Sequence, residues 1–257
     1  MLKSRITPCL LVHNKGLVKT VKFKEGKYVG DPINAVRIFN EKEVDELIVL
    51  DIDATVNGVE PNYKMIENLA SECRMPLCYG GGVKTAEQAE RILSLGVEKV
   101  AVSSAAIENP EIITEIAAQA GSQSVIVVLD VKKRRFGSKY DVWTHNGTKN
   151  TKLCPFELVE RLEKLGVGEF VINSIDQDGV MKGYDQSLIQ KIHETVNVPM
   201  TALGGAGSLD DIQGLVKKHG IIGAAAGSLF VFKGVYKAVL INYPNPEIKR
   251  ELLRIED

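Results

Sequence analysis

The sequence is poor in cysteine and in aromatic residues, and it has no excess of charge of either sign. Aromatic residues make up 6% of the chain, and the cysteines, which are scattered without a CxxC pair, are Cys9, Cys73, Cys78 and Cys154. We therefore expect free thiols and no disulfide framework. The 32 Lys and Arg residues balance 33 Asp and Glu residues, giving a net charge of −1. A chain without a basic field lacks the usual electrostatic attraction to nucleic acid or anionic membranes.

Long apolar runs and familiar cofactor motifs are also missing. Uncharged stretches such as that from about His219 to Phe232 are shorter than the ~20 residues that span a bilayer, and the N-terminal segment lacks the cleavage pattern of a signal peptide. We therefore expect a cytoplasmic protein with no membrane span. The sequence contains no GxGxxG or GxSxG motif, and its four histidines are dispersed. We accordingly expect no cofactor and no metal site.

The chain does contain a regular alternation of short β-branched runs with longer stretches of helical period. Eight rounds of about 32 residues fit a single α/β domain, the (β/α)₈ or TIM barrel, which usually has about 250 residues. The predicted strands are Ile6–Val12, Glu46–Asp51, Met75–Gly80, Lys99–Ser103, Ser124–Asp130, Glu169–Ser174, Pro199–Leu203 and Ile222–Ala226. Helix starts are predicted at Pro32, Pro61, Pro110 and Pro155, and at N-caps Thr85 and Ser208. The long segments 13–30 and 131–153 are expected to be functional loops.

The two halves of the chain resemble each other at an offset of 123 residues. The segment PLCYGGGVKTAEQAERILSLGVEKVAVSSA matches PMTALGGAGSLDDIQGLVKKHGIIGAAAGS, and the same offset carries Asp53 onto Asp176. Such a repeat predicts one barrel, 1–257, made of half-barrels at approximately 1–122 and 123–245 with a C-terminal tail, 246–257.

Glycine and serine clusters follow four of the predicted strands, in pairs related by the repeat. They are Gly81 and Gly82, Ser103 and Ser104, Gly204 and Gly205, and Gly227 and Ser228. The strand ends of a (β/α)₈ barrel carry its site, where bare backbone N–H groups and a helix N-terminus can hold an anion. We predict two phosphate cradles that face each other across the barrel mouth. The plainer interpretation is that the glycines only close tight turns.

A carboxylate ends one of the apolar strands. Asp130 follows a run of valine and isoleucine, where a charge is costly unless it acts or is paired, so it is the predicted general acid/base. The other carboxylates at strand ends are Asp51, Asp176 and Asp178. Leu11 precedes Asp130 by 119 residues, which is close to the offset of the repeat, and we take it as the matching position after the first strand. An acid/base pair across the barrel axis therefore lacks one member.

These residues resemble, over nearly the whole chain, HisF, the cyclase subunit of imidazole glycerol phosphate synthase. The resemblance rests on the segments RITPCL, GDP, DELIVLDIDA, YGGGV, VEKVAVSSA, GSQSV, DQDGVMKGYD and LGGAG. In that family the barrel accepts ammonia from a glutaminase and closes an imidazole ring on a bisphosphorylated substrate. The resemblance therefore implies a HisH-like glutaminase partner at the N-terminal face of the barrel and a phosphorylated small molecule at the other.

The resemblance also implies roles for individual residues. Asp130 matches one of the family's two catalytic aspartates, and Leu11 stands in place of the other. The clusters of glycine and serine match the family's two phosphate sites. Further matches to its substrate site are Lys19, Asp176 and Asp178. The matches to a charged ring that gates an ammonia passage at the N-terminal face are Arg5, Glu46, Lys99 and Glu169.

Leucine cannot exchange a proton, so a ring closure that uses two opposed acids loses about 10²–10⁴-fold in rate. All four gate residues are present, although burying charged side chains costs free energy of desolvation.

The segment CLLVHNKGLVKTVKFKEGKYVGDPINAVRIFNEKEVDELI is similar to HisF-like proteins associated with glycosyl amidation in bacterial surface-polysaccharide clusters. That branch implies a barrel that relays ammonia to a separate ATP-dependent amidotransferase, which makes an acetamidino group on a nucleotide sugar for O-antigen or flagellar glycan. The alternatives are a working cyclase of histidine biosynthesis and a phosphate-binding barrel without ammonia traffic.

Overall fold

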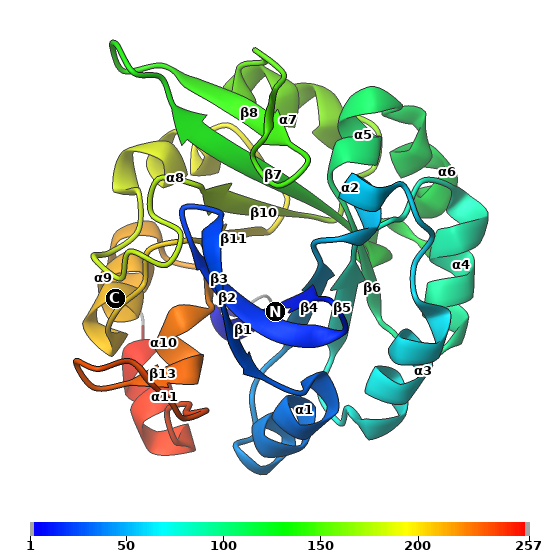
Figure 1. Ribbon diagram of the computed structural model, residues 1–257. Helices are drawn as coiled ribbons and strands as arrows, with labels where there is room; N and C mark the ends of the chain where they lie inside the picture. The colour runs from blue at the N-terminus through cyan, green and yellow to red at the C-terminus, as the bar shows by residue number, and fades with distance from the viewer. Residues whose placement is uncertain (1–2, 255–257) are drawn as a thin grey trace.

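Eight parallel strands close into a barrel in the computed structural model, which describes residues 3–254 (Figure 1). They are β1 (Arg5–His13), β4 (Leu47–Asp51), β5 (Leu77–Gly80), β6 (Lys99–Val102), β7 (Val125–Lys133), β10 (Glu169–Ser174), β11 (Met200–Leu203) and β12 (Gly223–Ala226). The barrel is closed because β12 pairs with β1 and β7 pairs with β10, both in parallel register. The predicted (β/α)₈ fold is confirmed, and each predicted strand overlaps an observed one.

Helices surround the barrel on its outside (Figure 1). Their bounds are α1 Pro32–Glu41, α2 Ala54–Asn57, α3 Tyr63–Glu72, α4 Ala86–Ser94, α5 Ser104–Glu108, α6 Glu111–Ala120, α7 Pro155–Glu163, α8 Gln186–His193, α9 Leu209–His219, α10 Ser228–Val231 and α11 Pro246–Leu252, with a 3₁₀ turn at Ser122–Ser124. Thr85 and Ser208 cap α4 and α9 as predicted, each accepting a backbone N–H with its hydroxyl. The start predicted at Pro61 is wrong by two residues, because Asn62 makes the cap of α3.

The two long segments expected to be loops are β-hairpins that extend the sheet. After β1 the chain forms β2 (Gly16–Val21) and β3 (Lys24–Gly30), and β7 continues into a hairpin with β8 (Tyr140–Thr144) and β9 (Lys149–Asn150). A third hairpin, β13 (Phe232–Lys233) and β14 (Ala238–Val239), follows α10. All three hairpins lie on the side of the barrel where the strands end (Figure 1).

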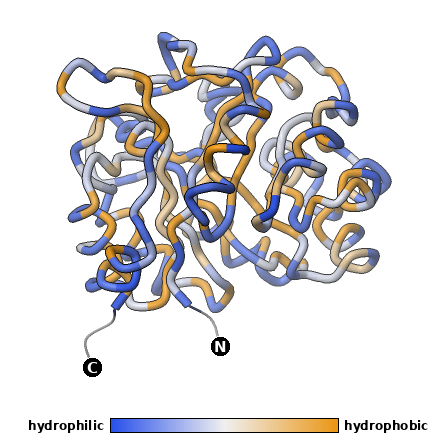
Figure 2. Tube along the Cα trace, turned by 90° about the horizontal axis from the view of Figure 1, so that it is seen from below, coloured by the Kyte–Doolittle hydropathy of each residue, from blue (hydrophilic) through white to orange (hydrophobic). Residues whose placement is uncertain are grey.

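The apolar residues form two layers. A large cluster lies between the strands and the helices, and a smaller one fills the inside of the barrel. The hydropathy-coloured tube shows hydrophobic stretches running through the interior, with hydrophilic residues frequent along the periphery (Figure 2). This is the pattern expected for parallel strands buried on both faces. All four cysteines are free thiols, as expected.

The division into half-barrels remains a prediction. Within the predicted tail, α11 is anchored by an ion pair of 2.6 Å between Lys249 Nζ and Asp45 Oδ1, and residues 255–257 lie outside the described part of the chain. No helix within residues 3–254 has both the length and the apolar character needed to cross a membrane.

Candidate functional site

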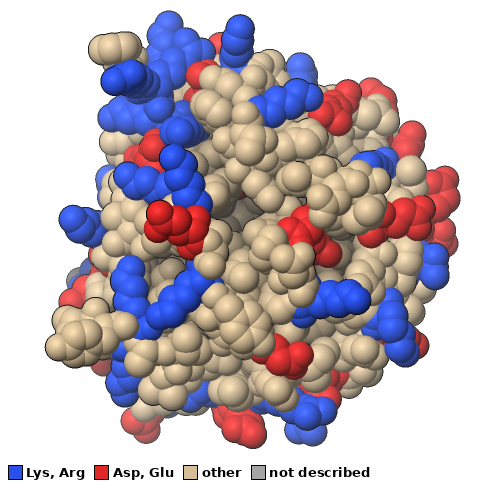
Figure 3. Space-filling model, in the orientation of Figure 1, with Lys and Arg blue, Asp and Glu red and all other residues tan. Residues whose placement is uncertain are grey.

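The carboxyl ends of the barrel strands surround a pocket, and the face seen in Figure 3 is hollowed near its centre. The predicted site residues that line this pocket are Lys19, Gly81, Gly82, Ser103, Ser104, Asp130, Asp178, Gly204, Gly205, Gly227 and Ser228. Asp176 lies outside it, where its Oδ2 accepts the backbone N–H of Lys133 at 2.9 Å. The fold thus brings together every predicted substrate-site residue except Asp176.

Asp130 lies on β7 in the wall of the pocket and is held by the next strand. Asn173 of β10 donates from Nδ2 to Asp130 Oδ1 at 2.9 Å, and the two residues are direct partners in the sheet. Burial raises the pKa of Asp130 to about 7; the Asn173 hydrogen bond opposes this rise, and the negative charge of Asp178 adds to it. A carboxyl group that titrates near neutral pH can both take up and release a proton, which suits a general acid/base.

The raised pKa of Asp130 makes the stability of the protein depend on pH. Because the folded-state pKa lies above the unfolded value, the contribution of Asp130 is fully present below about pH 4 and is lost as pH rises through about 7. Asp130→Asn removes this dependence while its amide oxygen can still accept from Asn173. We expect the free energy of unfolding of the variant, relative to the parent, to rise by roughly 2–3 kcal/mol between about pH 5 and pH 8. Urea denaturation at the two pH values measures it, and a constant difference would show that the carboxyl group titrates normally.

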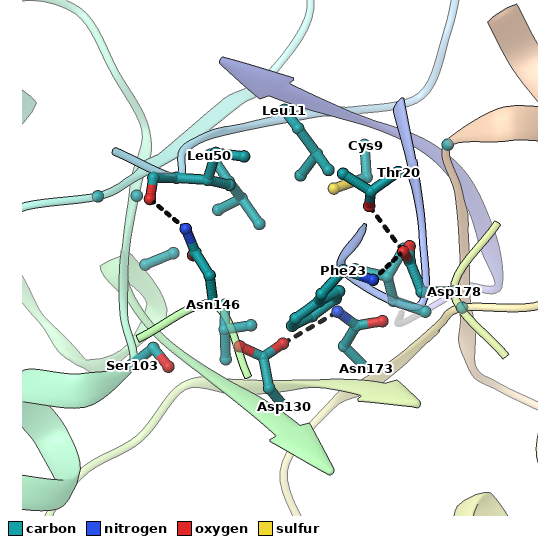
Figure 4. A pocket seen from close by; sticks show the side chains of 18 of the residues that line it. Cys9, Leu11, Thr20, Phe23, Leu50, Ser103, Asp130, Asn146, Asn173 and Asp178 are labelled. Carbon is teal, nitrogen blue, oxygen red and sulfur yellow. Dashed lines mark hydrogen bonds between the residues drawn. The ribbon is translucent and has the colours of Figure 1, made fainter. Parts of the chain in front are cut away.

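The pocket wall opposite Asp130 is apolar. Leu11 of β1 and Leu50 of β4 are partners in the sheet, and both line the pocket. Figure 4 shows Leu11 across the pocket from Asp130, with Cys9 beside it. A leucine side chain offers no proton at the position where a second acid would face the first.

Two further carboxylates line the pocket, and each is engaged by neighbouring donors. Asp51 Oδ1 accepts two backbone N–H groups of the following turn, at 3.0 and 3.2 Å. Asp178 Oδ2 accepts from Thr20 Oγ1 at 2.7 Å and from the backbone N–H of Phe23 at 3.2 Å. Burial raises the pKa of both carboxyl groups, and these hydrogen bonds oppose the rise. Asp130 differs from these two carboxylates, because among the described residues its hydrogen bond comes from the side-chain amide of Asn173 on the neighbouring barrel strand and not from a turn or a hairpin.

The glycines of the predicted cradles are required by the turns themselves. Gly81 and Gly205 have φ values of +121° and +113°, and a Cβ at either position would overlap a backbone carbonyl oxygen, that of Asp51 or Gly183 respectively. This agrees with the plainer interpretation of these glycines. The two phosphate cradles remain a prediction, supported by the helices α5 and α10, which begin at the pocket with Ser104 and Ser228.

Lys19 reaches from β2 to the last barrel strand. It is buried, its Nζ donates to the carbonyl oxygen of Cys9, and a Cβ on Gly227 would overlap the same nitrogen. Burial lowers the pKa of Lys19, and the nearby Cys9 and Asp178 oppose this effect. A lysine amine therefore lies beside Gly227 and Ser228, at one of the two predicted phosphate cradles.

Sequence reasoning missed the hairpin residues that cover the pocket. Phe23, in the β2–β3 turn, projects over it, and Asn146, in the β8–β9 turn, donates from Nδ2 to the carbonyl oxygen of Ile52 at 2.7 Å across its mouth (Figure 4). A Cβ on Gly147 would lie 3.0 Å from the Phe23 ring, so the two turns meet. The available signal was the pair GLVKTV and KEGKYVG, whose alternation and central turn are typical of a hairpin.

At the opposite end of the barrel the four predicted gate residues form a closed ring of ion pairs. Arg5 Nε lies 2.6 Å from Glu46 Oε2, and the Arg5 guanidinium also contacts Glu169. Lys99 Nζ lies 2.5 Å from Glu46 Oε1 and 3.2 Å from Glu169 Oε2. Thr201 Oγ1 donates to Glu169 at 2.6 Å. Since each residue lies at the start of a different strand, positive and negative charges alternate around the barrel axis.

Both cations of this ring are held in the charged form. Burial alone would lower the pKa of Arg5 and of Lys99, but attraction to Glu169 and Glu46 outweighs it, so both pKa values lie above their ordinary range. The glutamate side chains are 4% and 7% exposed and cannot be hydrated instead. The ring is charged and closed in this structure.

Side chains fill the barrel interior between the ring and the pocket. The buried residues there are Cys9, Ile48, Cys78, Ala101, Ile126, Val128, Val171, Leu203 and Ala225. Thr7, which lies on the same face of β1 as Arg5 and Cys9, is 0% exposed, and its hydroxyl has no hydrogen-bond partner among residues 3–254. A packed interior is usual for this fold. The passage that the resemblance implies is therefore not an open tube within the described residues.

Residues 5–237 of the chain match the family described as "Histidine biosynthesis protein". A protein of Vibrio vulnificus (strain YJ016), provisionally named imidazole glycerol phosphate synthase subunit hisF3, is 63% identical over 255 residues, which are 99% of this chain and 98% of that protein. A Pseudomonas aeruginosa protein with the corresponding provisional name, hisF2, is 55% identical over 95% of this chain and 97% of its own. The imidazole glycerol phosphate synthase subunit HisF of Natranaerobius thermophilus, named without reservation, is 37% identical over 95% of this chain and 96% of its own.

Proposed function

The chain belongs to the histidine biosynthesis protein family, as a HisF-like synthase subunit, and we propose that it conducts ammonia from a glutaminase to a separate amidotransferase. The observation that carries this proposal is the contrast between the two ends of the barrel. The ring of Arg5, Glu46, Lys99 and Glu169 is complete, whereas Asp130 faces Leu11 in the pocket. A subunit that only conducts ammonia needs the ring of ion pairs. A subunit that forms the imidazole product also needs a second acid opposite Asp130.

The chemistry of the barrel interior favours ammonia over ammonium. Moving a bare cation into an apolar interior costs far more than moving a neutral molecule of the same size. The ring itself balances two cations against two carboxylates, so it supplies no net negative charge that would stabilise an entering cation. Beyond the ring, the Thr7 hydroxyl has no partner within the described part of the chain, and a neutral molecule with N–H groups can hydrogen-bond to it. These features support NH₃ as the species that passes.

We further propose that the acceptor of the ammonia is an acetamido group on a nucleotide sugar. A HisH-like glutaminase binds at the ring, and an ATP-dependent amidotransferase replaces the acetamido oxygen with nitrogen, which gives an acetamidino group for a surface glycan. A phosphorylated small molecule occupies the glycine-lined pocket. The complex works in the cytoplasm, where glutamine and ATP are available.

A reconstitution with labelled glutamine tests this proposal. The barrel, the glutaminase and the amidotransferase of the same organism are combined with ATP, the acetamido sugar nucleotide and glutamine carrying nitrogen-15 in its amide. We expect the label in the acetamidino product, and little of it when the barrel is omitted at low free ammonium. Mass spectrometry of the sugar nucleotide measures the transfer. Label that reaches an imidazole product at the rate of a two-aspartate HisF, and not the sugar, would contradict the proposal.

A working cyclase is the second candidate function. It is favoured by Asp130, whose pKa of about 7 is well placed for acid/base work, and by the names of the relatives. In that case another group must replace the missing acid, and the barrel with its glutaminase would turn over the bisphosphorylated substrate without any amidotransferase.

A further inference from the structure

The three hairpins beside the pocket carry a concentration of positive charge that the balanced composition of the chain conceals. Their basic residues are Lys22, Lys24 and Lys27 of β2–β3, Lys132, Lys133, Arg134, Arg135 and Lys139 of β7–β8, and Lys233 and Lys237 of β13–β14. Over the segments 22–27, 132–139 and 233–237 the only acidic residue is Glu25. Blue side chains accordingly gather along the left side of the mouth in Figure 3. We call this surface the hairpin face.

The same hairpins also expose large hydrophobic side chains. Tyr236 is 93% exposed, Val235 92%, Phe136 85% and Tyr28 65%, and these are the four most exposed large hydrophobic residues among residues 3–254. Phe136 lies at the tip of the β7–β8 hairpin, and Val235 and Tyr236 lie at the tip of the β13–β14 hairpin. Burying such a side chain in a partner yields roughly 1.5–3 kcal/mol, so their exposure on projecting tips points to contacts with another molecule.

The hairpins form one continuous surface. Lys27 Nζ donates to the carbonyl oxygen of Lys237 at 3.0 Å and lies 5.0 Å from the centre of the Phe232 ring, which joins β2–β3 to β13–β14. The backbone N–H of Lys22 donates to the carbonyl of Asp178 at 2.9 Å, and Lys133 donates to Asp176, so the loop after β10 links β2–β3 to β7–β8. The basic residues therefore act together as one field beside the pocket.

Most of these charges are available to a partner. Among the described residues, Arg134 is the one basic side chain of the hairpin face that forms an ion pair, with Asp141 at 2.6 Å. Arginine, tyrosine and phenylalanine are enriched in the centres of protein interfaces, and charged rims steer partners of opposite sign. A nucleotide or a free phosphate would use the lysines but would leave the apolar tips in water.

We propose that the hairpin face is the docking surface for the amidotransferase, and that the amidotransferase presents an acidic surface with apolar recesses for the tips around Phe136 and Tyr236. This inference rests on the proposed function and adds the place of contact. The ring and the hairpin face lie at opposite ends of the barrel, so a glutaminase and an amidotransferase can bind at the same time. Docking beside the pocket also closes its mouth over the point where ammonia leaves, which a flat membrane surface would not do.

Two double variants of the barrel test the docking surface, studied in complex with the glutaminase and titrated with the amidotransferase of the same organism. Phe136→Ser with Tyr236→Ser removes the apolar tips, and Lys133→Glu with Arg135→Glu reverses two exposed charges. We expect each to weaken binding by about tenfold or more, and the charge variant also to reduce the dependence of affinity on salt. The matched control is Lys64→Glu with Arg161→Glu, which makes the same charge change on α3 and α7 and should alter affinity less than about twofold. Isothermal titration calorimetry measures affinity, and unchanged glutaminase binding and thermal unfolding show that the fold is intact.

The outcomes separate the inference from the proposed function. If the amidotransferase binds the parent and both hairpin variants equally, the docking surface is wrong and ammonia transfer can still stand. If it does not bind the parent and the complex cyclises the bisphosphorylated substrate, both fail. A third arm uses vesicles of phosphatidylcholine with one quarter phosphatidylglycerol. Vesicle binding that is lost in both hairpin variants, with unchanged affinity for the amidotransferase, would assign the surface to a membrane and overturn the inference.

Discussion

The purified chain, supplied with an ammonium salt and the bisphosphorylated histidine precursor, is expected to form the imidazole product about 10²–10⁴-fold more slowly than a HisF with two opposed aspartates. Leu11→Asp is expected to recover a large part of that loss. The new carboxylate would lie across the pocket from Asp130, whose own environment of Asn173 and buried wall is intact (Figure 4). A second acid in that place restores proton transfer on the side of the substrate that Leu11 leaves without a donor.

Leu11→Asn is the matched control for this experiment. Asparagine has nearly the shape and polarity of aspartate but cannot exchange a proton, so it should remain at the parent rate. Both variants place a polar group beside Leu50 and Cys9 and should be destabilised to a similar degree, which chemical denaturation can check. Product formation is followed by absorbance or chromatography. Parent turnover equal to that of a two-aspartate enzyme, or equal rates for the Asp and Asn variants, would contradict the expectation.

The second large effect is expected at the ring. Lys99→Met leaves Glu46 and Glu169 to share Arg5, so one buried negative charge loses its compensation. Breaking a buried pair in this way typically costs about 3–5 kcal/mol, and the 24% exposure of Lys99 places this variant toward the lower end. In the reconstituted complex, glutamine hydrolysis should continue while the share of its nitrogen that reaches product falls. Product formation from free ammonium should stay at the parent level.

A double variant distinguishes a conducting role of the ring from a structural one. Lys99→Met with Glu46→Gln removes one charge of each sign, so the ring is again neutral and the free energy of unfolding should recover in part. Coupling should stay low, because the alternating ring is still interrupted. Denaturation curves and the ratio of product formed to glutamine hydrolysed measure the two effects. Coupling that recovers together with stability would show that the ring only supports the fold.

The sequence predicts the barrel well because its strands are buried on both faces. A continuous apolar run such as that of β7 fits few other structures, and the ends of the barrel strands then bring Asp130 and the glycine clusters to one mouth. The ring was indicated in advance only by the resemblance to HisF, because nothing in the spacing or periodicity of the chain singles out its four residues.

The hairpins and the filled interior could not be predicted in the same way. Phe23 and Asn146 reach the pocket through pairings between segments far apart in the chain, which local periodicity does not report. The net charge of the chain does not reveal the hairpin face, because this surface forms only where three separate hairpins meet in space. Similarly, the packing of Ile48, Ile126 and Val171 inside the barrel depends on how their side chains interlock.

The packed interior also limits how nitrogen can be delivered. With the ring closed by ion pairs and the apolar layers above it in contact, a molecule can cross only during brief intervals in which several side chains move apart together. Collective rearrangements of this kind occur in about microseconds to milliseconds. Transfer would then proceed in bursts instead of as a steady stream, with a ceiling set by how often the interior opens, however fast the glutaminase works.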